Sequence, residues 1–380
     1  MVYDPGKIYS AALIGCGSMG SYCMDELQDA PGRILLPFGH AEILKTHPGT
    51  RLVAGADPDR ERLEDFGRRW GVDALYSDHR EMLEAERPEI VAIASPPDFH
   101  ASQVVDCAGN GVKGIFCEKP FTTTLALADR MIASCRESGT SLAVNHTRRG
   151  DPLILRSRRL LDEGGIGQVL SIVATWPGRL FLSGTHWFDL VNYLAGDKPP
   201  AWVVGHSEDP EISMVAIPTQ RGRDLGGSLY AVYPNGIRAF FNGRDSHAGY
   251  RVEVNGTKGV LSIGTTEVRL RKTNSGSVFR ELLEHPFPQM MHHTAPMVYL
   301  LEDLLEAVET GREPLSNGIT ARNALELILA THESSRRGNV KLQLPLQDRE
   351  TSPPFQWQNP DGSTFYRATA EDGSPPADDS

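Results

Sequence analysis

Short apolar runs alternate with longer amphipathic stretches over the first 149 residues of the chain. The apolar runs are rich in aliphatic side chains and are typical of strands. They cover residues 9–15, 50–57, 89–95, 112–118 and 141–146. Strands that alternate with helical segments indicate a parallel sheet with crossover helices. We therefore expect residues 1–149 to form an α/β domain with a doubly wound parallel sheet.

One connection in this region is unusually long. Residues 28–50 separate the first helical stretch from the second strand, whereas such connections usually need only a few residues. The segment opens with Pro and Gly, which favour a loop. We expect an inserted loop followed by a short helix.

The pattern changes after Arg149. One helical stretch, residues 153–165, precedes many β-rich runs, several of which are separated by turn pairs such as Asn255-Gly256. Such turns are typical of antiparallel hairpins. The runs cover residues 168–175, 201–207, 211–218, 227–233, 237–243, 250–256, 259–264 and 267–272. A second, α+β domain with a large and mainly antiparallel sheet is predicted for residues 150–346.

Two further helical patterns close this second region, and a polar tail follows. The helices are predicted over residues 295–311 and 318–338, each ending at a glycine. From residue 347 to 380 the chain is rich in Pro, Ser and acidic residues. Such a composition cannot bury much apolar area, so an extended, acidic tail is expected.

The charge balance restricts the classes of partner. Lys and Arg number 38 against 49 Asp and Glu, and the tail carries −5 of the net −11. An acidic balance disfavours nucleic acid as a partner. No apolar run approaches the ~20 residues of a membrane helix, and the first residues do not resemble a signal peptide. We therefore expect a soluble cytoplasmic protein without a membrane partner.

The cysteines do not suggest a cross-linked or metal-bound fold. All five lie within the first 135 residues, and no two form a C-x-x-C pair. Neither a disulfide framework nor a zinc site is expected. The adjacent His292 and His293 lack a third ligand at a suitable spacing, so no metal is predicted.

A glycine-rich turn follows the first predicted strand. Gly15, Gly17 and Gly20 form a G-x-G-x-x-G pattern that also includes Ser18 and Met19. Glycines allow a tight turn and a close approach to a pyrophosphate, whose charge then sits at the helix N-terminus. This context predicts a dinucleotide-binding Rossmann domain.

Asp57 ends the second predicted strand, where a carboxylate can bind the hydroxyls of an adenosine ribose. The inserted loop explains why it lies about twice the usual ~20 residues from the glycines. A carboxylate there would also repel the 2′-phosphate of NADP. NAD is therefore favoured over NADP, although Arg60 and Arg62 lie close enough in sequence to weaken this preference.

Two more polar motifs follow predicted strands at the ligand-binding edge of the sheet. Ser95, Pro96 and His100 belong to an S-P-P-x-x-H segment, and Glu118, Lys119 and Pro120 form an E-K-P tripeptide. With the glycine turn, these ordered motifs resemble the Gfo/Idh/MocA oxidoreductases, the glucose-fructose oxidoreductase and inositol dehydrogenase family. The resemblance extends from about residue 8 to 346 and implies that the three motifs line the cofactor groove. It also implies that Lys119 reaches both nicotinamide ribose and substrate.

The second domain contains a segment that resembles the family's histidine motif. Residues 183–190 include Thr185, His186 and Asp189. The resemblance implies that His186 is the acid/base, and an imidazole with an ordinary pKa of ~6.5 can accept a hydroxyl proton. Asp189 lies three residues further along the same helical face, where it can orient the ring or pair with a distant base. The family's usual Asp four residues before the His is Leu182 here, which puts the substrate pose in doubt.

Other residues are weaker candidates for substrate binding. Asn145, Arg148 and Arg149 close the fifth predicted strand, where they either face the interdomain cleft or form a solvated basic linker. Trp176 either stacks on a sugar ring or fills the core. Thr185 precedes His186 and is expected to lie near the substrate.

These observations predict an NAD-dependent dehydrogenase that oxidises a secondary hydroxyl of a sugar, sugar derivative or cyclitol. His186 would take the hydroxyl proton while Lys119 polarises the same oxygen. Two alternatives stay open. One is an enzyme that keeps its NAD and uses transient oxidation for epimerisation, elimination or glycoside cleavage; the other is a non-catalytic NAD or sugar sensor. An exposed apolar sheet face would favour a homodimer or homotetramer.

Overall fold

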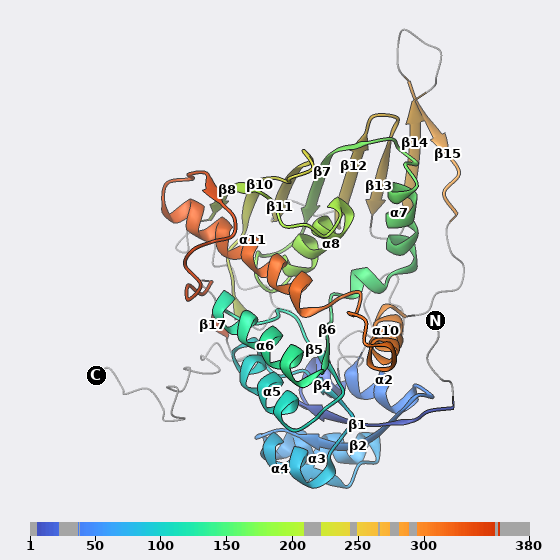
Figure 1. Cartoon of the computed structure of the whole chain (residues 1–380), viewed down its shortest axis with the longest axis vertical. Helices are drawn as coiled ribbons and strands as arrows, with labels where there is room; N and C mark the ends of the chain where they lie inside the picture. Colours follow the sequence, from blue (N-terminus) through green and yellow to red (C-terminus); the bar gives the residue numbers. More distant parts are fainter. Residues whose placement is uncertain are drawn as a thin grey trace.

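The computed structural model describes residues 6–22, 37, 39–208, 222–243, 249–264, 267–273, 281–288, 295–353 and 356–357. A parallel sheet and its helices form one end of the molecule, and a larger sheet forms the other (Figure 1). Helices from both halves of the chain lie between the two sheets. The predicted α/β fold with two sheets of different kinds is confirmed.

The first sheet has six parallel strands among the described residues, in the order β3-β2-β1-β4-β5-β6. The strands are β1 (Tyr9–Ile14), β2 (Thr50–Ala56), β3 (Ala74–Tyr76), β4 (Ile90–Ile93), β5 (Gly114–Cys117) and β6 (Ser141–Val144). Five of them were predicted. The strand β3 was not, because it has three residues and all are only half-buried, which leaves a weak apolar signal.

Crossover helices cover both faces of this sheet. They are α2 (His40–Thr46), α3 (Arg60–Trp70), α4 (His79–Glu86), α5 (Pro97–Gly109) and α6 (Leu125–Ser138). Local chemistry sets their ends: Asp59 accepts hydrogen bonds from two backbone N–H groups at the start of α3, and Gly71 ends it with a φ of 63°. The short helix α2 confirms the one expected at the end of the long connection; most of the preceding loop lies outside the described residues.

The second sheet has nine strands among the described residues, in the order β15-β14-β13-β12-β7-β11-β10-β8-β16. All neighbours are antiparallel except β7 and β11. The strands are β7 (Val169–Trp176), β8 (Trp202–Ser207), β10 (Gly227–Val232), β11 (Arg238–Gly243), β12 (Arg251–Gly256), β13 (Gly259–Gly264), β14 (Val268–Thr273), β15 (Leu282–His285) and β16 (Leu342–Gln343). The strand predicted over residues 211–218 lies outside the described residues. The strand β15 was missed, since its four residues are all exposed.

Four longer helices complete the described second half of the chain. They are α7 (Pro152–Asp162), α8 (Thr185–Ala195), α10 (Pro296–Thr310) and α11 (Gly318–Arg336). Helix α10 packs on the parallel sheet, where Leu300 and Leu304 share a buried cluster with Phe116 of β5. An amphipathic pattern predicts a helix but does not say which sheet its apolar face will cover. The chain therefore returns to its first sheet after it has built the second.

Shorter elements adjoin both sheets. They are the π-helical turn η1 (Ser18–Tyr22), the 3-10 turn η2 (Thr147–Gly150), and the paired strands β9 (Gly222–Arg223) and β17 (Gln356–Trp357). Part of the predicted tail has defined contacts, since the backbone N–H of Ala126 on α6 donates to the Arg349 carbonyl at 2.9 Å. Most of the remaining tail lies outside the described residues.

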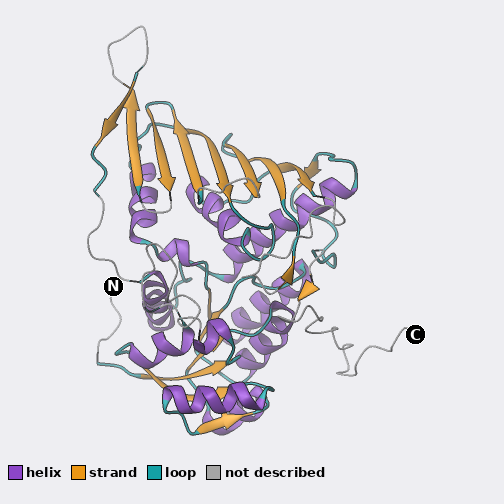
Figure 2. Cartoon of the chain, turned by 180° about the vertical axis from the view of Figure 1, so that it is seen from behind, coloured by secondary structure: helices purple, strands orange, loops and turns teal. Residues whose placement is uncertain are grey.

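One face of the nine-stranded sheet carries an aromatic cluster, which consists of Trp202, Tyr230 and Phe240. Trp202 and Tyr230 have ring centroids 5.5 Å apart, and Tyr230 and Phe240 are 4.8 Å apart. Helices α8 and α11 lie on the other side of this sheet (Figure 2). Phe240 is 45% exposed, whereas its neighbours Ala239 and Phe241 are buried beneath it. Among the described residues, this sheet face thus leaves the apolar ring of Phe240 partly exposed.

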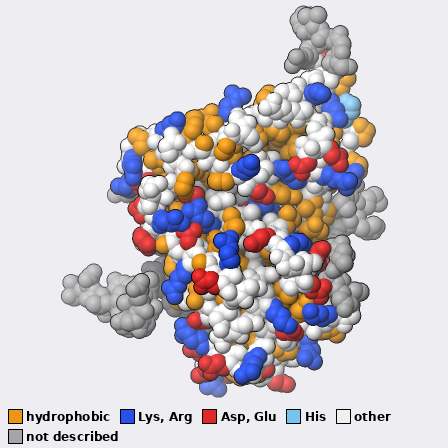
Figure 3. Space-filling model, in the orientation of Figure 1, with side chains coloured by type: hydrophobic (Ala, Val, Ile, Leu, Met, Phe, Trp, Pro, Cys, Tyr) orange, Lys and Arg blue, Asp and Glu red, His pale blue; other side chains and the backbone are white. Residues whose placement is uncertain are grey.

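Charged side chains of both signs are mixed over the face of the molecule shown in Figure 3. Lys and Arg do not form a continuous basic surface on this face. Among the described helices, none combines the length and the hydropathy that a bilayer crossing requires.

Candidate active site

The glycine turn joins β1 to η1 at the carboxyl edge of the parallel sheet. Gly15 has a φ of 90°, and a Cβ there would lie 2.6 Å from the Ser95 nitrogen. A Cβ on Gly20 would lie 2.0 Å from the Gly15 carbonyl oxygen. Around Gly17, however, a Cβ would meet no heavy atom within 4 Å. The turn is closed on its protein side and open at Gly17, which fits the approach of a pyrophosphate. Ser18 and Met19 follow in the first turn of η1.

Asp57 follows β2 and contacts the same turn. Its Oδ2 accepts a hydrogen bond from the Cys16 backbone N–H at 2.8 Å, and its Oδ1 accepts one from Asp59 at 2.9 Å. Burial raises the pKa of this carboxyl group. Each oxygen keeps a second lone pair. The carboxylate therefore holds the glycine turn in place and retains acceptors for ribose hydroxyls.

The S-P-P-x-x-H segment is anchored by its histidine. Pro96 precedes α5 as its N-cap residue, and the Ser95 hydroxyl donates to Gln103 at 2.6 Å. The His100 side chain is fully buried, with Nε2 2.8 Å from the Ser95 carbonyl and Nδ1 3.1 Å from the Phe121 carbonyl. His100 thus links the turn after β4 to the turn after β5. In this geometry it supports the groove from behind and exposes no ring edge to a cofactor.

Glu118 has a similar supporting position at the end of β5. Its Oε1 lies 2.9 Å from Nε2 of the buried His40, and it also accepts a hydrogen bond from the Asn145 amide. The Lys119 backbone N–H donates to its Oε2 at 3.0 Å. Burial opposes ionisation, but the hydrogen bond and charge of His40, with the charge of Lys119, lower the pKa of Glu118 to about 2. An ionised Glu118 therefore fixes the backbone that carries Lys119.

Sequence reasoning missed His40. It lies in α2 at the end of the long connection, 78 residues before Glu118 in the chain. No motif surrounds it, and the helical pattern alone does not distinguish an inward-facing histidine from a surface one. Asn145 was predicted to bind substrate; its amide nitrogen is used by Glu118, and its buried Oδ1 has no protein partner among the described residues.

Lys119 reaches from the first half of the chain to the turn before α8. Its Nζ lies 3.4 Å from the carbonyl oxygen of Leu182. Burial lowers the pKa of Lys119, and the charge of Arg148 lowers it further, while Glu118 acts in the opposite direction. The lysine therefore lies next to the segment that contains His186.

His186 is half-buried in the first turn of α8. Its ring packs edge to face with the ring of His146, with centroids 5.9 Å apart. Burial is the largest cause that lowers its pKa well below the usual value, followed by the positive charges of Arg148 and Lys119. The imidazole is consequently neutral at neutral pH and able to accept a proton.

Thr185 and His146 form a buried pair beside this ring. His146 Nε2 lies 2.9 Å from the Thr185 hydroxyl oxygen, and burial lowers the pKa of His146 to about 4. Thr185, predicted to lie near the substrate, is 2% exposed in this structure and contacts His146. His146 was missed as a site residue because it appeared only as the end of a predicted strand.

Asp189 does not contact His186 through any hydrogen bond in the described structure. Both oxygens of its carboxylate accept a hydrogen bond from Arg149 Nε–H, at 2.9 and 2.8 Å. Two roles were predicted for Asp189, orienting the His186 ring or pairing with a distant base. The structure shows the pairing. The solvated-linker alternative is wrong for Arg149, which is fully buried and also binds Asp197 through both terminal nitrogens.

Arg148, the neighbour of Arg149, points toward two aromatic rings. Its guanidinium carbon lies 4.1 Å from the centroid of Trp187 and 5.4 Å from that of Tyr250. Trp176, by contrast, has no exposed surface and stacks on the inner side of Trp187 at 6.3 Å. A side chain without exposed surface offers no face to a sugar, so the structure places Trp176 in the core.

Sequence reasoning also missed Asp224. Its Oδ2 accepts hydrogen bonds from the backbone N–H groups of Phe181 and Leu182, both at 2.8 Å. Burial raises the pKa of Asp224 to about 7. The residue lies 38 positions beyond His186 and in no motif. Its carboxylate holds the turn whose Leu182 carbonyl contacts Lys119.

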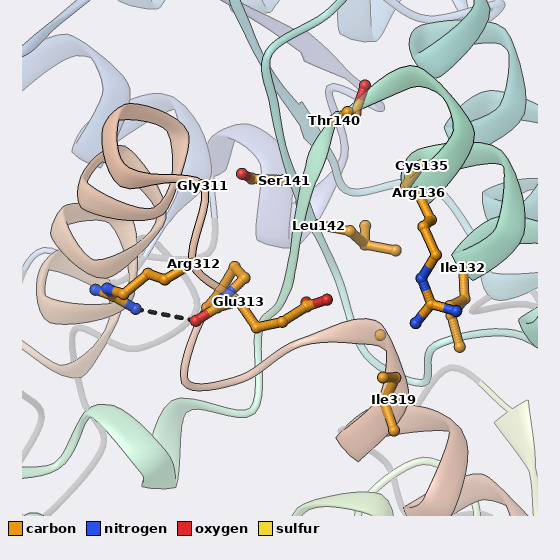
Figure 4. A pocket seen from close by; sticks show the side chains of 13 residues that line it. Ile132, Cys135, Arg136, Thr140, Ser141, Leu142, Gly311, Arg312, Glu313 and Ile319 are labelled. Carbon is orange, nitrogen blue, oxygen red and sulfur yellow. Dashed lines mark hydrogen bonds between the residues drawn. The ribbon is translucent and has the colours of Figure 1, made fainter.

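The described structure also has a cavity of about 190 Å³ that is separate from these residues. It is lined by Thr140 and Ser141 at the start of β6, by Arg136 of α6, and by Arg312 and Glu313 after α10 (Figure 4). The motifs instead follow the carboxyl ends of the parallel strands. This cavity therefore lies at the opposite edge of the sheet. No cluster of three or more metal-ligating side chains occurs within the described ranges.

Relatives of the chain include several dehydrogenases. It is 27% identical over 370 residues to D-apiose dehydrogenase from Paraburkholderia graminis, covering 88% of this chain and 89% of the relative. It is 28% identical to scyllo-inositol 2-dehydrogenase (NAD(+)) from Bacillus subtilis, covering 80% and 92%. Levoglucosan dehydrogenase, solved with NADH and levoglucosan, has the same fold, with a TM-score of 0.71, 19% identity, and coverage of 90% of this chain and all of the other.

Two family models match the chain. Residues 9–146 match the model described as "Oxidoreductase family, NAD-binding Rossmann fold", and residues 177–344 match "Oxidoreductase family, C-terminal alpha/beta domain". The glycine turn, open at Gly17 and supported by Asp57, fits the cofactor named for the first of these. The chain is therefore an NAD-binding oxidoreductase that belongs to the Gfo/Idh/MocA family.

Proposed function

We propose that this protein is an NAD-dependent dehydrogenase that oxidises a secondary hydroxyl group of a sugar, sugar derivative or cyclitol. The observation that carries the proposal is the approach of Lys119 to the turn before His186, with its Nζ 3.4 Å from the Leu182 carbonyl. This contact brings a cation and a neutral imidazole from different halves of the chain to one place. The relatives named for apiose and inositol support the substrate class.

In this proposal His186 is the general base. Its depressed pKa keeps the ring neutral, so that it can take the proton of the substrate hydroxyl. Lys119 polarises the same oxygen and stabilises the negative charge that develops as the proton leaves. When bound, NAD would supply the acceptor for the hydride that leaves the substrate carbon. Glu118 and Asp224 position the two backbone segments that carry Lys119 and the turn before His186.

The glycine turn and Asp57 are proposed to hold the dinucleotide, with Gly15, Gly17 and Gly20 at the pyrophosphate and Asp57 at the adenosine ribose. Ser95 and Pro96 adjoin this turn, since the Ser95 nitrogen lies 2.6 Å from the position that a Cβ on Gly15 would have. His100 and Glu118 support the same groove through their buried hydrogen bonds. We further propose that residues 1–149 and 150–346 act as the cofactor and substrate domains, with α10 joining them.

A panel of sugars, polyols and cyclitols tests the proposal, with NADH formation followed by absorbance. Oxidation of at least one compound, with free NADH as a product in each turnover, is expected. NAD that copurifies and is unchanged after turnover would instead favour the reading of transient oxidation. Saturable sugar binding by the NAD-bound protein without oxidation of any compound would favour a sensor.

A further inference from the structure

We propose that the substrate of this site carries a carboxylate group, which the guanidinium of Arg148 binds. This inference rests on the proposed function and deepens it, because it narrows the substrate to an acidic sugar derivative such as an aldonate or a uronate. It assigns a specificity role to Arg148, which lies at the end of the parallel sheet next to both Lys119 and His186.

Three groups able to carry positive charge lie together here. The charge of Arg148 lowers the pKa values of both Lys119 and His186, after burial as the larger cause. Lys119 in turn lowers the pKa of His186. The geometry agrees, because the Arg148 guanidinium lies 4.1 Å from the ring of Trp187, the residue after His186, and Lys119 Nζ lies 3.4 Å from the carbonyl of Leu182, four residues before it. Like charges destabilise one another, so a site of this kind is favoured by an anionic ligand.

The nearby protein carboxylates have other partners. Glu118 binds His40 and Asn145, although its charge still favours protonated Lys119. Asp189 binds Arg149, and the carboxylate of Asp151 caps α7, although its charge still favours protonated Arg148. Leu182, whose carbonyl contacts Lys119, has an apolar side chain and supplies no carboxylate there. The acid that the protein does not provide can come from the substrate.

Arg148 is also held ready for a planar anion. Trp187 and Tyr250 lie against the guanidinium at 4.1 and 5.4 Å, and these contacts limit its rotation. Its Nε is buried without a hydrogen-bond partner among the described residues. A buried donor without a partner is costly, and the fork of N–H groups on an arginine matches the two oxygens of a carboxylate. A carboxylate would therefore satisfy the orphaned donor and balance the positive charge of the cluster together.

Matched substrate pairs test the proposal in the NAD-bound protein. D-Gluconate is compared with D-glucitol, and methyl β-D-glucuronide with methyl β-D-glucoside, by kcat/KM for NADH formation. We expect the acid of a pair to be preferred. Arg148→Gln should lower kcat/KM for the acid by about 10- to 100-fold, the range for losing a charged hydrogen bond, mainly through KM. The kcat/KM for the neutral member should change much less. Arg148→Lys should restore part of the kcat/KM lost for the acid.

Arg159→Gln is the matched control, because it removes the same charge from α7 at an exposed residue that pairs with Glu163. Arg159→Gln should keep the kcat/KM values of the parent protein. Arg148→Gln should bind NAD with the same affinity as the parent protein. Preference for neutral members, or for a sugar phosphate, or an equal loss on both members of a pair would overturn the carboxylate assignment and leave the dehydrogenase intact.

Calorimetry distinguishes a protein that binds the acid without oxidising it from a protein that does not bind the acid. If no compound is oxidised, D-gluconate and methyl β-D-glucuronide are titrated into the NAD-bound protein. Binding that Arg148→Gln abolishes would support the carboxylate site and contradict the dehydrogenase. Absence of both binding and oxidation would overturn both proposals.

Discussion

Arg149 Nε lies 2.9 and 2.8 Å from the two carboxylate oxygens of Asp189, and both side chains are fully buried. The pair joins η2, which follows the parallel sheet, to α8, three residues beyond His186. Asp197 binds the other two nitrogens of the guanidinium. The pair therefore fixes the candidate base relative to the cofactor half of the molecule.

Arg149→Met should destabilise the protein strongly, because it leaves the Asp189 carboxylate buried without its cation. A broken buried ion pair typically costs about 3–5 kcal/mol. Asp189→Asn should cost less, since Asp197 still neutralises Arg149. Urea unfolding of both variants measures the difference. A loss below about 1 kcal/mol for Arg149→Met would contradict the central role given to this pair.

Lys119→Ala and His186→Ala should each lower turnover by orders of magnitude while the fold stays intact, because both side chains are only half-buried. Removal of a general base alone typically costs about 10²- to 10⁴-fold. The measurement is kcat for the best substrate of the panel, with circular dichroism and NAD titration as checks on folding. Near-normal turnover of either variant would remove that residue from the mechanism.

The pH profile of sugar oxidation should reflect the low pKa of His186. Arg148, Lys119 and His146 all face this ring and, after burial, disfavour its protonation. Only the neutral ring accepts a proton. The value of kcat/KM should therefore stay constant as the pH falls well below 6.5, the ordinary pKa of histidine. In Arg148→Gln one positive charge is gone, and the acidic limb should move upward. A limb near 6.5 in the parent would contradict the lowered pKa assigned to His186.

Asp57→Ala should weaken NAD binding and reduce the preference of the protein for NAD over NADP. The change removes the ribose acceptors and the repulsion of a 2′-phosphate, and it also frees the Cys16 N–H in the glycine turn. Fluorescence titration with NADH and NADPH compares the two affinities. A parent protein that already binds NADPH more tightly would contradict the role assigned to Asp57.

The aromatic cluster on the larger sheet is the surface we expect to be buried in a homodimer or homotetramer. Phe240→Glu places a charge among Trp202 and Tyr230, and an interface that buries this cluster would have to desolvate it. Light scattering should then show a smaller assembly than the parent, with α8 and α11 still covering the opposite face. An unchanged mass would locate any interface elsewhere.

The sequence by itself determined five of the six described strands of the first sheet and the motifs that follow them. Its strands are nearly continuous apolar runs because helices cover both faces of a parallel sheet, and such runs are readable without any tertiary information. The glycines were readable for a related reason. Gly20 meets the Gly15 carbonyl within the same turn, so this constraint on residue type lies next to the residue itself. Gly15 also lies in this local pattern, although the atoms that a Cβ there would meet belong to Ala94 and Ser95 after β4.

Only the tertiary structure decided which polar side chains act together. His40 reaches Glu118 across 78 residues, and Asp224 holds the N–H of Leu182 across 42. Neither spacing has a period or a motif, because the partners come from separate elements. The same reason explains Asp189: helical spacing placed it near His186, but its partner Arg149 lies 40 residues earlier in the chain. Burial and ion pairing are set by the packing of distant segments, and this packing decided that Trp176 fills the core while Arg148 faces the site.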